Sequence, residues 1–220
     1  MDARDAGEES FEIGRETETE TETEAELSNQ WPDKFDEEGR VFKARMLEFH
    51  ELGKWLRGRI MRAVAVGLGI EEGWFDRLLH YPEVRSEAFR ENGNTVRAGA
   101  HTDYWSITCL FQDDRGGLQV LPPSSNYVDA TPIKDTIVVN AGDLLARWSN
   151  KTIKSTKHRV VEPPTTADVH PARYSIAYFC NPNFDQFIDA IAGTYSETRP
   201  KQYPGMSSGE YLVQRLAATY

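Results

Sequence analysis

Residues 97–112, RAGAHTDYWSITCLFQ, decide the fold of this 220-residue chain. Their second half, Ser106–Gln112, is rich in the β-branched, aromatic and apolar residues that are typical of strands. Turn residues such as Gly116-Gly117 and Pro122-Pro123 then separate four similar runs. These runs are Leu118–Leu121, Thr136–Asn140, Lys157–Val161 and Arg173–Cys180. Short strands at regular spacing predict a sandwich, a barrel or a jelly roll.

Helices are expected on both sides of this β region. Before it, apolar residues recur at the helical period over residues 38–68, and a short second helix is predicted at Glu71–Leu79, ending before Pro82. After it, a closing helix is predicted at Ser207–Ala218. The chain therefore divides into a tail at 1–28, a helical lead-in at 29–94 and a mainly β domain at 95–220.

Negative charge is confined to the N-terminal part. Residues 1–38 carry 15 acidic and 3 basic side chains, net −12, whereas residues 39–220 carry 20 and 22, net +2. A nearly neutral domain without a dense Lys/Arg stripe argues against a nucleic-acid partner. The alternating Glu/Thr run Glu16–Glu24 has no apolar face to bury, so we expect residues 1–28 to be a disordered, solvated tail. An acidic interaction segment is the alternative.

The sequence also predicts where the chain resides. It contains no run of 18 consecutive apolar residues, so no membrane partner is expected, and it begins without the basic and apolar regions of a secretory signal. Cys109 and Cys180 lie in apolar runs, where buried reduced thiols are the plain interpretation. We therefore expect a cytoplasmic protein.

His101-Thr-Asp103 and His158 carry the chemistry. Period-2 alternation in an extended chain places His101 and Asp103 on one face, and His158 follows in another strand-like run. Two imidazoles and one carboxylate form the facial ligand set of non-haem iron(II) oxygenases, which leaves positions open for a chelating cosubstrate and oxygen. A catalytic zinc site also uses three protein ligands, so a zinc hydrolase remains an alternative on these residues alone.

Arg173-Tyr-Ser175 adds a second pattern. Arg173 and Ser175 share a strand face, and a guanidinium with a neighbouring hydroxyl suits a carboxylate ligand. In the alternative interpretation, Arg173 pairs with a local acid such as Asp185.

With these residues in place, the chain resembles the iron(II)/2-oxoglutarate-dependent dioxygenases of the isopenicillin-N-synthase-like superfamily over residues 29–220. The matching stretches are 77–82 (RLLHYP), 97–104 (RAGAHTDY), 110–114 (LFQDD), 116–120 (GGLQV), 138–145 (VVNAGDLL), 155–161 (STKHRVV), 173–176 (RYSI) and 209–212 (GEYL).

The resemblance implies a fold, a site and an activity. The fold would be a double-stranded β-helix, the jelly-roll version of a cupin barrel, preceded by a long helix. His101, Asp103 and His158 would bind iron(II), while Arg173, Ser175 and Tyr81 would bind 2-oxoglutarate; the alternative for Tyr81 is a packed ring beside Pro82. The chain would be an oxidoreductase that uses O2, with ascorbate as a helpful reductant. It would hydroxylate or desaturate a small organic molecule and release succinate and carbon dioxide.

The sequence says less about which residues contact the substrate. Trp105, where family members commonly carry glycine, either narrows the pocket or covers the mouth of the barrel. Phe179 and Asn181 line the barrel in the resemblance and are candidate substrate contacts. Asn140 and Gly142-Asp143 match a family turn, which we interpret as structural. Neither the substrate nor the oligomeric state follows from the sequence.

The largest departure from the family precedes Asn29, where relatives carry a sizeable region with additional strands. We therefore expect a chain that is N-terminally short relative to the family. The alternative function is a catalytically inactive jelly-roll fragment or interaction module. A further alternative is a relative that oxidises without 2-oxoglutarate.

Overall fold

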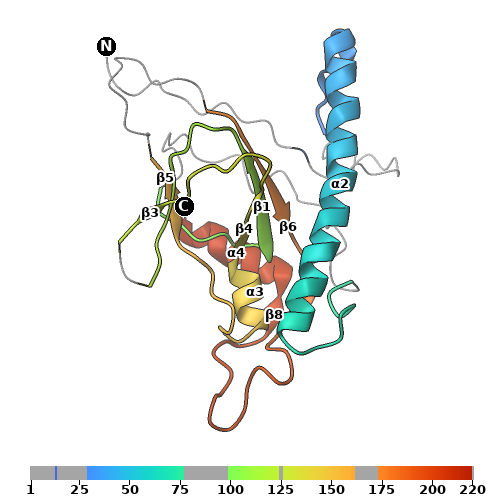
Figure 1. Cartoon of the computed structure of the whole chain (residues 1–220). Coiled ribbons are helices and arrows are strands. Elements are labelled where there is room, and N and C mark those ends of the chain that lie inside the picture. Colours follow the sequence, from blue (N-terminus) through green and yellow to red (C-terminus); the bar gives the residue numbers. More distant parts are fainter. Residues whose placement is uncertain (1–12, 14–28, 77–98, 124–125, 162–172, 220) are drawn as a thin grey trace. The chain divides into compact units, whose positions relative to one another are not determined.

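The computed structural model describes residues 13, 29–76, 99–123, 126–161 and 173–219 (Figure 1). From residue 29 onward, the described residues belong to two compact units, a helical unit that includes 29–76 and a β unit that includes 99–219. The predicted tail at 1–28, apart from residue 13, lies outside the described residues, and so does Tyr81. None of the described helices is long and apolar enough to cross a membrane.

The helical unit is built on α2 (Glu37–Gly67), which confirms the helix predicted at 38–68. Asp36 caps its N-terminus by accepting a hydrogen bond from the Gly39 amide over 2.7 Å. A short 3-10 helix, η1 (Pro32–Lys34), packs so closely that a Cβ at Gly39 would lie 2.1 Å from the Pro32 carbonyl oxygen. Glycine is therefore required at the start of α2.

The second helix predicted at Glu71–Leu79 is wrong over the described part. Residues 72–76 form turns, closed by bonds from the Trp74 amide to the Glu71 carbonyl and from the Asp76 amide to the Gly73 carbonyl. Gly73 disfavours continuation as a helix. Instead, the turn is anchored by the buried ring of Phe75 and by an ion pair of 2.8 Å between Arg62 and Asp76.

The β unit consists of short antiparallel strands in three sheets. The first has the order β4-β1-β6, the second β3-β2-β5, and the third pairs β7 with β8. The bounds are β1 Ile107–Gln112, β2 Leu118–Val120, β3 Val128–Asp129, β4 Val138–Ala141, β5 His158–Val160, β6 Ser175–Cys180, β7 Phe187–Ile188 and β8 Met206–Ser207. All five predicted strands are present, each slightly shorter than predicted. The mainly β class is confirmed.

The first sheet has two different faces because side chains alternate along its strands. Ile107 and Cys109 are buried on one face and lie opposite Cys180 and Tyr178 of β6. Both cysteines are free and buried, as predicted. Thr108 faces the other way, opposite Asn140 on β4 and Phe179 on β6. This second face carries the candidate site.

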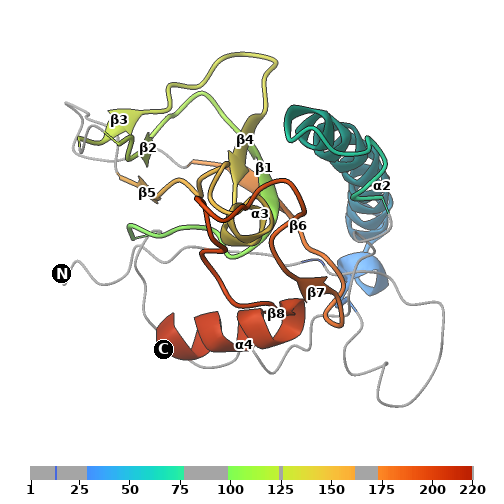
Figure 2. The same ribbon diagram turned by 90° about the horizontal axis from the view of Figure 1, so that it is seen from below.

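Two helices support the β unit. The first, α3 (Asp143–Trp148), begins where only a turn is predicted and buries Leu144, Leu145 and Trp148. The second, α4 (Ser208–Thr219), confirms the predicted closing helix and runs along one side of the unit beside β8 (Figure 2). Ser207 and Glu210 form a capping box at its start: Glu210 accepts from the Ser207 amide over 2.9 Å, and the Glu210 amide donates to the Ser207 hydroxyl over 3.1 Å.

Candidate metal centre

His101 and His158 lie opposite each other on an antiparallel bridge. The amide of His101 donates to the carbonyl of His158 over 2.9 Å, and the amide of His158 donates back over 2.9 Å. This bridge joins the segment before β1 to the first residue of β5. The two imidazole ring centres consequently lie 4.3 Å apart.

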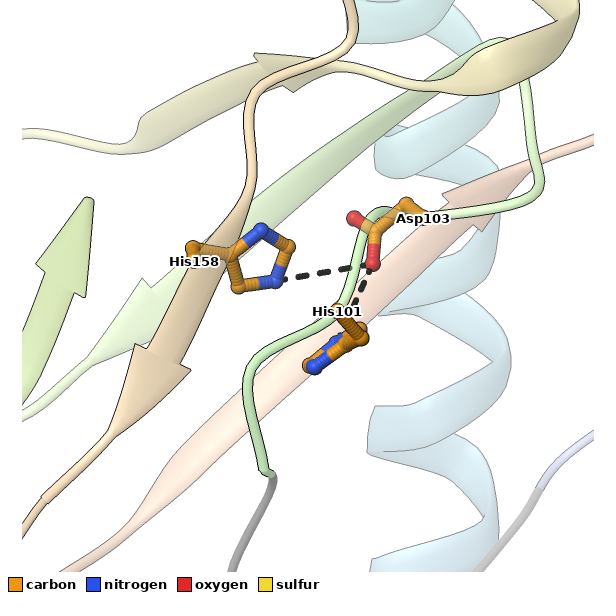
Figure 3. Close-up of side chains that lie close together, drawn as sticks. All are labelled: His101, Asp103 and His158. Carbon is orange, nitrogen blue, oxygen red and sulfur yellow. Dashed lines mark ion pairs between the residues drawn. The ribbon is translucent and has the colours of Figure 1, made fainter. Parts of the chain in front are cut away.

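Asp103 completes the cluster on the same side (Figure 3). Its Oδ1 lies 3.6 Å from Nε2 of His101 and 3.6 Å from Nε2 of His158. One candidate ligand atom from each residue lies within 4.8 Å of the other two. This compact set of two imidazole nitrogens and one carboxylate oxygen fits a single metal ion bound on one face. The structure therefore brings together the three residues that the sequence predicts as metal ligands.

The second oxygen of Asp103 is held by two donors. Thr108 donates its hydroxyl to Oδ2 over 2.5 Å, and Asn140 donates its amide to the same atom over 2.8 Å. Oδ1 is thereby turned toward the imidazoles. Partners of this kind orient metal ligands and tune their basicity. Asn140 thus contacts a candidate ligand directly, so a purely structural interpretation of Asn140 is too narrow.

Both imidazoles are oriented by backbone carbonyls. Nδ1 of His101 lies 2.6 Å from the carbonyl oxygen of Gly99, and Nδ1 of His158 lies 3.1 Å from that of Thr156. A carbonyl only accepts, so each Nδ1 carries the proton of the neutral ring. In the neutral form, Nε2 of each ring is therefore unprotonated and faces Asp103, as a metal ligand must.

The electrostatics favour an ionised carboxylate. Burial alone would raise the pKa of Asp103, but hydrogen bonds from His101, Thr108 and Asn140 outweigh burial and lower this pKa to about 2. In return, the hydrogen bond to Asp103 raises the pKa of His101 above its ordinary value. Below this raised pKa, Nε2 of His101 carries a proton that bonds Asp103, and a cation that binds at the site must replace it.

The start of α3 holds the backbone of the ligand segment in place. The Asp143 amide donates to the Asp103 carbonyl over 2.8 Å, and the Leu144 amide donates to the Trp105 carbonyl over 3.2 Å. A Cβ at Gly142 would lie 2.1 Å from the Trp105 carbonyl oxygen. Glycine here lets the helix start approach the ligand segment. These backbone contacts agree with the structural interpretation of Gly142-Asp143, and they also place Asp143 directly against the ligand segment.

Arg173 and Ser175 lie at the other end of the same sheet face. Nη1 of Arg173 donates to the Ser175 hydroxyl over 3.0 Å, so the predicted pair is formed. Two further bonds position the guanidinium, from Nε to the Gly116 carbonyl over 2.9 Å and from Nη2 to Oε1 of Gln112 over 3.3 Å. Within the described residues no carboxylate, Asp185 included, forms an ion pair with Arg173. The cationic fork remains available to a carboxylate ligand.

The candidate substrate residues lie on or beside this face. The ring centres of Trp105 and Phe179 are 5.7 Å apart, with 48° between the ring planes, and the Phe179 side chain is 43% exposed. Oδ1 of Asn181 is buried and accepts no hydrogen bond from any described residue. Trp105, which follows the candidate ligand Asp103 by two residues, thus lies against Phe179.

Sequence reasoning missed Thr108 and Gln112. Thr108 is the polar residue inside the otherwise apolar run Ile107–Phe111, and alternation places it on the face of Asn140. Gln112 shares that face through its pairing with Ser175. The available signal for Thr108 was a polar side chain that interrupts an apolar strand. Gln112 ends the strand, and the alternation that places it on the face of Thr108 was its signal.

Comparison with known proteins places this site in a family. The model of the 2OG-Fe(II) oxygenase superfamily matches residues 77–182, which include all three candidate ligands. A solved full-length structure from Neurospora crassa, in complex with alpha-KG and thymine, is 49% identical, covers 96% of this chain and 73% of that chain, and has a TM-score of 0.76. The chain belongs to the 2OG-Fe(II) oxygenase superfamily.

Other members of this superfamily agree with that assignment. The 2-oxoglutarate-Fe(II) type oxidoreductase ppzD of Metarhizium majus is 32% identical over 99% of this chain and 63% of its own length. A putative 2OG-Fe(II) oxygenase family protein from Caulobacter crescentus is 27% identical over 94% of this chain and 68% of that chain, with a TM-score of 0.76. The chain spans 57% to 63% of the length of the first curated relatives that it matches. These neighbours bear out the expected jelly-roll core.

Proposed function

We propose that this chain is an iron(II)- and 2-oxoglutarate-dependent dioxygenase that oxidises a small organic molecule. The observation that carries this proposal is the approach of one oxygen of Asp103 to Nε2 of both His101 and His158, at 3.6 Å each. The Arg173–Ser175 pair on the neighbouring strand adds a site for a carboxylate. This complete set favours catalysis over a role as a non-catalytic interaction module.

Each residue has a defined task. When bound, iron(II) with 2-oxoglutarate supplies the oxidative chemistry, in which O2 and 2-oxoglutarate convert a C–H bond into an alcohol with release of succinate and carbon dioxide. His101, Asp103 and His158 would hold the metal and leave room for the cosubstrate. Arg173 and Ser175 bind the far carboxylate of 2-oxoglutarate through charge-assisted hydrogen bonds. The metal ligands would thus hold one end of the cosubstrate, and Arg173 with Ser175 the other.

A pyrimidine base is the substrate class that we propose. Two full-length structures from Neurospora crassa, 55% and 49% identical to this chain, contain 5-formyluracil and thymine, respectively, with alpha-KG. In this chain the exposed ring of Phe179, with Trp105 against it, offers an aromatic face for a planar heterocycle. Oδ1 of Asn181, which accepts no hydrogen bond from a described residue, offers an acceptor for a ring N–H. Together these groups suit a flat, polar-edged molecule.

The test is turnover by purified protein with iron(II), ascorbate and 2-oxoglutarate, in the presence and absence of thymine. We expect succinate to form with thymine and a product heavier by one oxygen atom in mass spectrometry. The variant His158→Ala should abolish both. Oxygen consumption that needs no 2-oxoglutarate would instead support a relative that oxidises without this cosubstrate. Wild-type protein that binds neither iron nor 2-oxoglutarate would refute the proposal.

Cytoplasmic location and the absence of nucleic-acid and membrane partners remain parts of this proposal. Cys109 and Cys180 are free and buried, which fits a reducing compartment and supports the location. Fractionation of the producing cells, followed by detection with an antibody, would test it.

A further inference from the structure

The C-terminal helix α4 reaches the metal segment through one carboxylate. Oδ2 of Asp143 accepts the hydroxyl of Thr102 over 3.2 Å and the phenol of Tyr211 over 3.0 Å. Arg215 approaches the same oxygen at 3.6 Å. Thr102 lies between the candidate ligands His101 and Asp103, whereas Tyr211 and Arg215 belong to α4. A single oxygen atom therefore connects the two segments.

Helix α4 also contacts the ligand segment through Arg215 and Tyr104. The guanidinium of Arg215 lies over the ring of Tyr104, with its central carbon 4.7 Å from the ring centre. Tyr104 directly follows Asp103 in the chain. Tyr211 and Arg215 are four residues apart, so they lie on the same face of α4. This face contacts the side chain of Tyr104 directly and that of Thr102 through Asp143.

The helix is anchored firmly enough to act on the segment. Its start is fixed by the capping box of Ser207 and Glu210 and by a bond of 2.8 Å from the Gly209 amide to the Phe184 carbonyl. Tyr211 itself is 7% exposed. Burial, together with the Asp143 carboxylate, raises the pKa of the Tyr211 phenol, so its hydroxyl remains a donor. The contact is therefore a buried, charge-assisted hydrogen bond.

Asp143 transmits this support to the ligand. Its amide donates to the carbonyl of Asp103 over 2.8 Å, while its side chain accepts from Thr102 and Tyr211. Asp143 therefore holds the segment by its backbone and by its side chain. We propose that Tyr211 and Arg215 are positioning residues of the metal centre, which act through Asp143 and Tyr104 on the segment that presents His101 and Asp103.

This inference rests on the metal site of the proposed function, and its test measures metal binding rather than turnover. Co(II) serves as the probe, because its visible absorption reports binding directly. Removal of an oriented outer partner costs roughly 10- to 100-fold in metal affinity. Tyr211 acts one step further out, so we expect Tyr211→Phe to weaken Co(II) binding by about three- to tenfold.

Tyr203→Phe is the matched control. The ring of Tyr203 packs on Arg147, as the ring of Tyr211 also does, but its hydroxyl makes no hydrogen bond to a described residue. We expect Tyr203→Phe to bind Co(II) like the wild type. A loss confined to the melting temperature of Tyr211→Phe, with unchanged affinity of the folded protein, would show a merely structural role and overturn the inference.

A double-mutant cycle with Thr102→Val gives a second, independent reading. Both hydroxyls act through Oδ2 of Asp143, so the affinity loss of the double variant should be smaller than the product of the two single losses. Losses that simply multiply would contradict the proposed connection. If the wild-type protein does not bind Co(II), the proposed metal site is refuted. If it binds Co(II) but Tyr211→Phe has the same affinity, only the proposed connection through Asp143 is refuted.

Discussion

Asn140 donates its side-chain amide to Oδ2 of Asp103 over 2.8 Å and so turns the other carboxylate oxygen toward two imidazoles. Asn140 lies on β4, and Asp103 lies in the segment that leads into the neighbouring strand β1, so the contact ties this segment to the sheet. A buried carboxylate without such donors would lose its charge more readily. The sheet thus prepares the ligand before any metal arrives.

Asn140→Ala should therefore weaken metal binding. Without the amide, Oδ2 retains only the Thr108 hydroxyl, and the carboxylate is free to rotate away from His101 and His158. We expect the dissociation constant for Co(II), measured by titration calorimetry, to rise roughly 10- to 100-fold. Val139→Ala changes the adjacent residue, which points to the opposite face, and should leave the affinity near that of the wild type. Equal losses in both variants would contradict the role of Asn140.

The pH dependence of metal-free stability should carry the signature of His101. Its hydrogen bond to Asp103 raises the folded-state pKa of His101 above the ordinary 6.5. Such a group contributes stability that is fully present below about pH 6.5 and lost as pH rises through the raised value. Asp103 behaves oppositely: its pKa of about 2 contributes stability above pH 3.8 that is lost only as pH falls toward 2. Between about pH 3.8 and pH 6.5 we expect these two contributions to the stability of the metal-free protein to stay constant.

The measurement compares melting temperatures of metal-free wild type and His101→Gln from pH 4 to pH 9. The difference between the two proteins should be largest at low pH and shrink above about pH 6.5. Metal affinity should follow the reverse trend and strengthen as pH rises, because the cation displaces the proton. A difference in melting temperature that is constant across this pH range would show that the pKa of His101 is not raised by folding and would refute this prediction.

The sequence alone was sufficient to predict the three metal ligands, but not the residues that orient them. His101 and Asp103 are two residues apart in an extended segment, so alternation alone places them together. His158 follows from its own strand-like run and from the ligand set of two imidazoles and one carboxylate. Thr108 and Asn140 are long-range partners, and their meeting at Asp103 depends on the register Thr108↔Asn140 between β1 and β4. No local pattern encodes that register.

Local signals also failed where tertiary contacts decide the outcome. Glu71–Leu79 has the composition of a helix, yet the ion pair from Arg62 to Asp76 and burial of Phe75 hold residues 72–76 in turns. Conversely, α3 begins at a stretch that looks like a turn, because Gly142 permits its start to pack on the Trp105 carbonyl. Propensity is a weak guide when packing against a neighbouring segment outweighs it.

Gly142→Ala should destabilise the β unit and the metal site together. The backbone at Gly142 is extended, with φ −97°, so the requirement is for space rather than for an unusual conformation. A methyl group there would lie 2.1 Å from the Trp105 carbonyl oxygen and 3.0 Å from that of Asp103. We expect a loss of roughly 1–3 kcal/mol or more in the free energy of unfolding, measured by urea denaturation.

Gly58→Ala is the contrasting variant. Gly58 lies inside α2, and an added Cβ would meet nothing within 4 Å. This change should stabilise the helix by about 0.5–1 kcal/mol, since alanine is the better helix former. Opposite signs for the two glycines would support the close approach at Gly142, whereas similar small gains would show that the site has room for a side chain.

Arg173→Lys should separate cosubstrate binding from metal binding. Lysine keeps the charge but lacks the planar fork, and it cannot reproduce the bonds to Gly116, Ser175 and Gln112. We expect the affinity of the Co(II)-loaded protein for 2-oxoglutarate, measured by calorimetry, to fall roughly tenfold to a hundredfold, because hydrogen bonds to charged groups are worth about 1.5–3 kcal/mol. Co(II) affinity should be unchanged.

The matched control is Arg159→Lys, at an arginine that bonds Gln119 and lies over the ring of Tyr127 in the other sheet, and it should leave 2-oxoglutarate binding intact. If both variants lose 2-oxoglutarate equally, or Arg173→Lys loses none, the far carboxylate binds elsewhere.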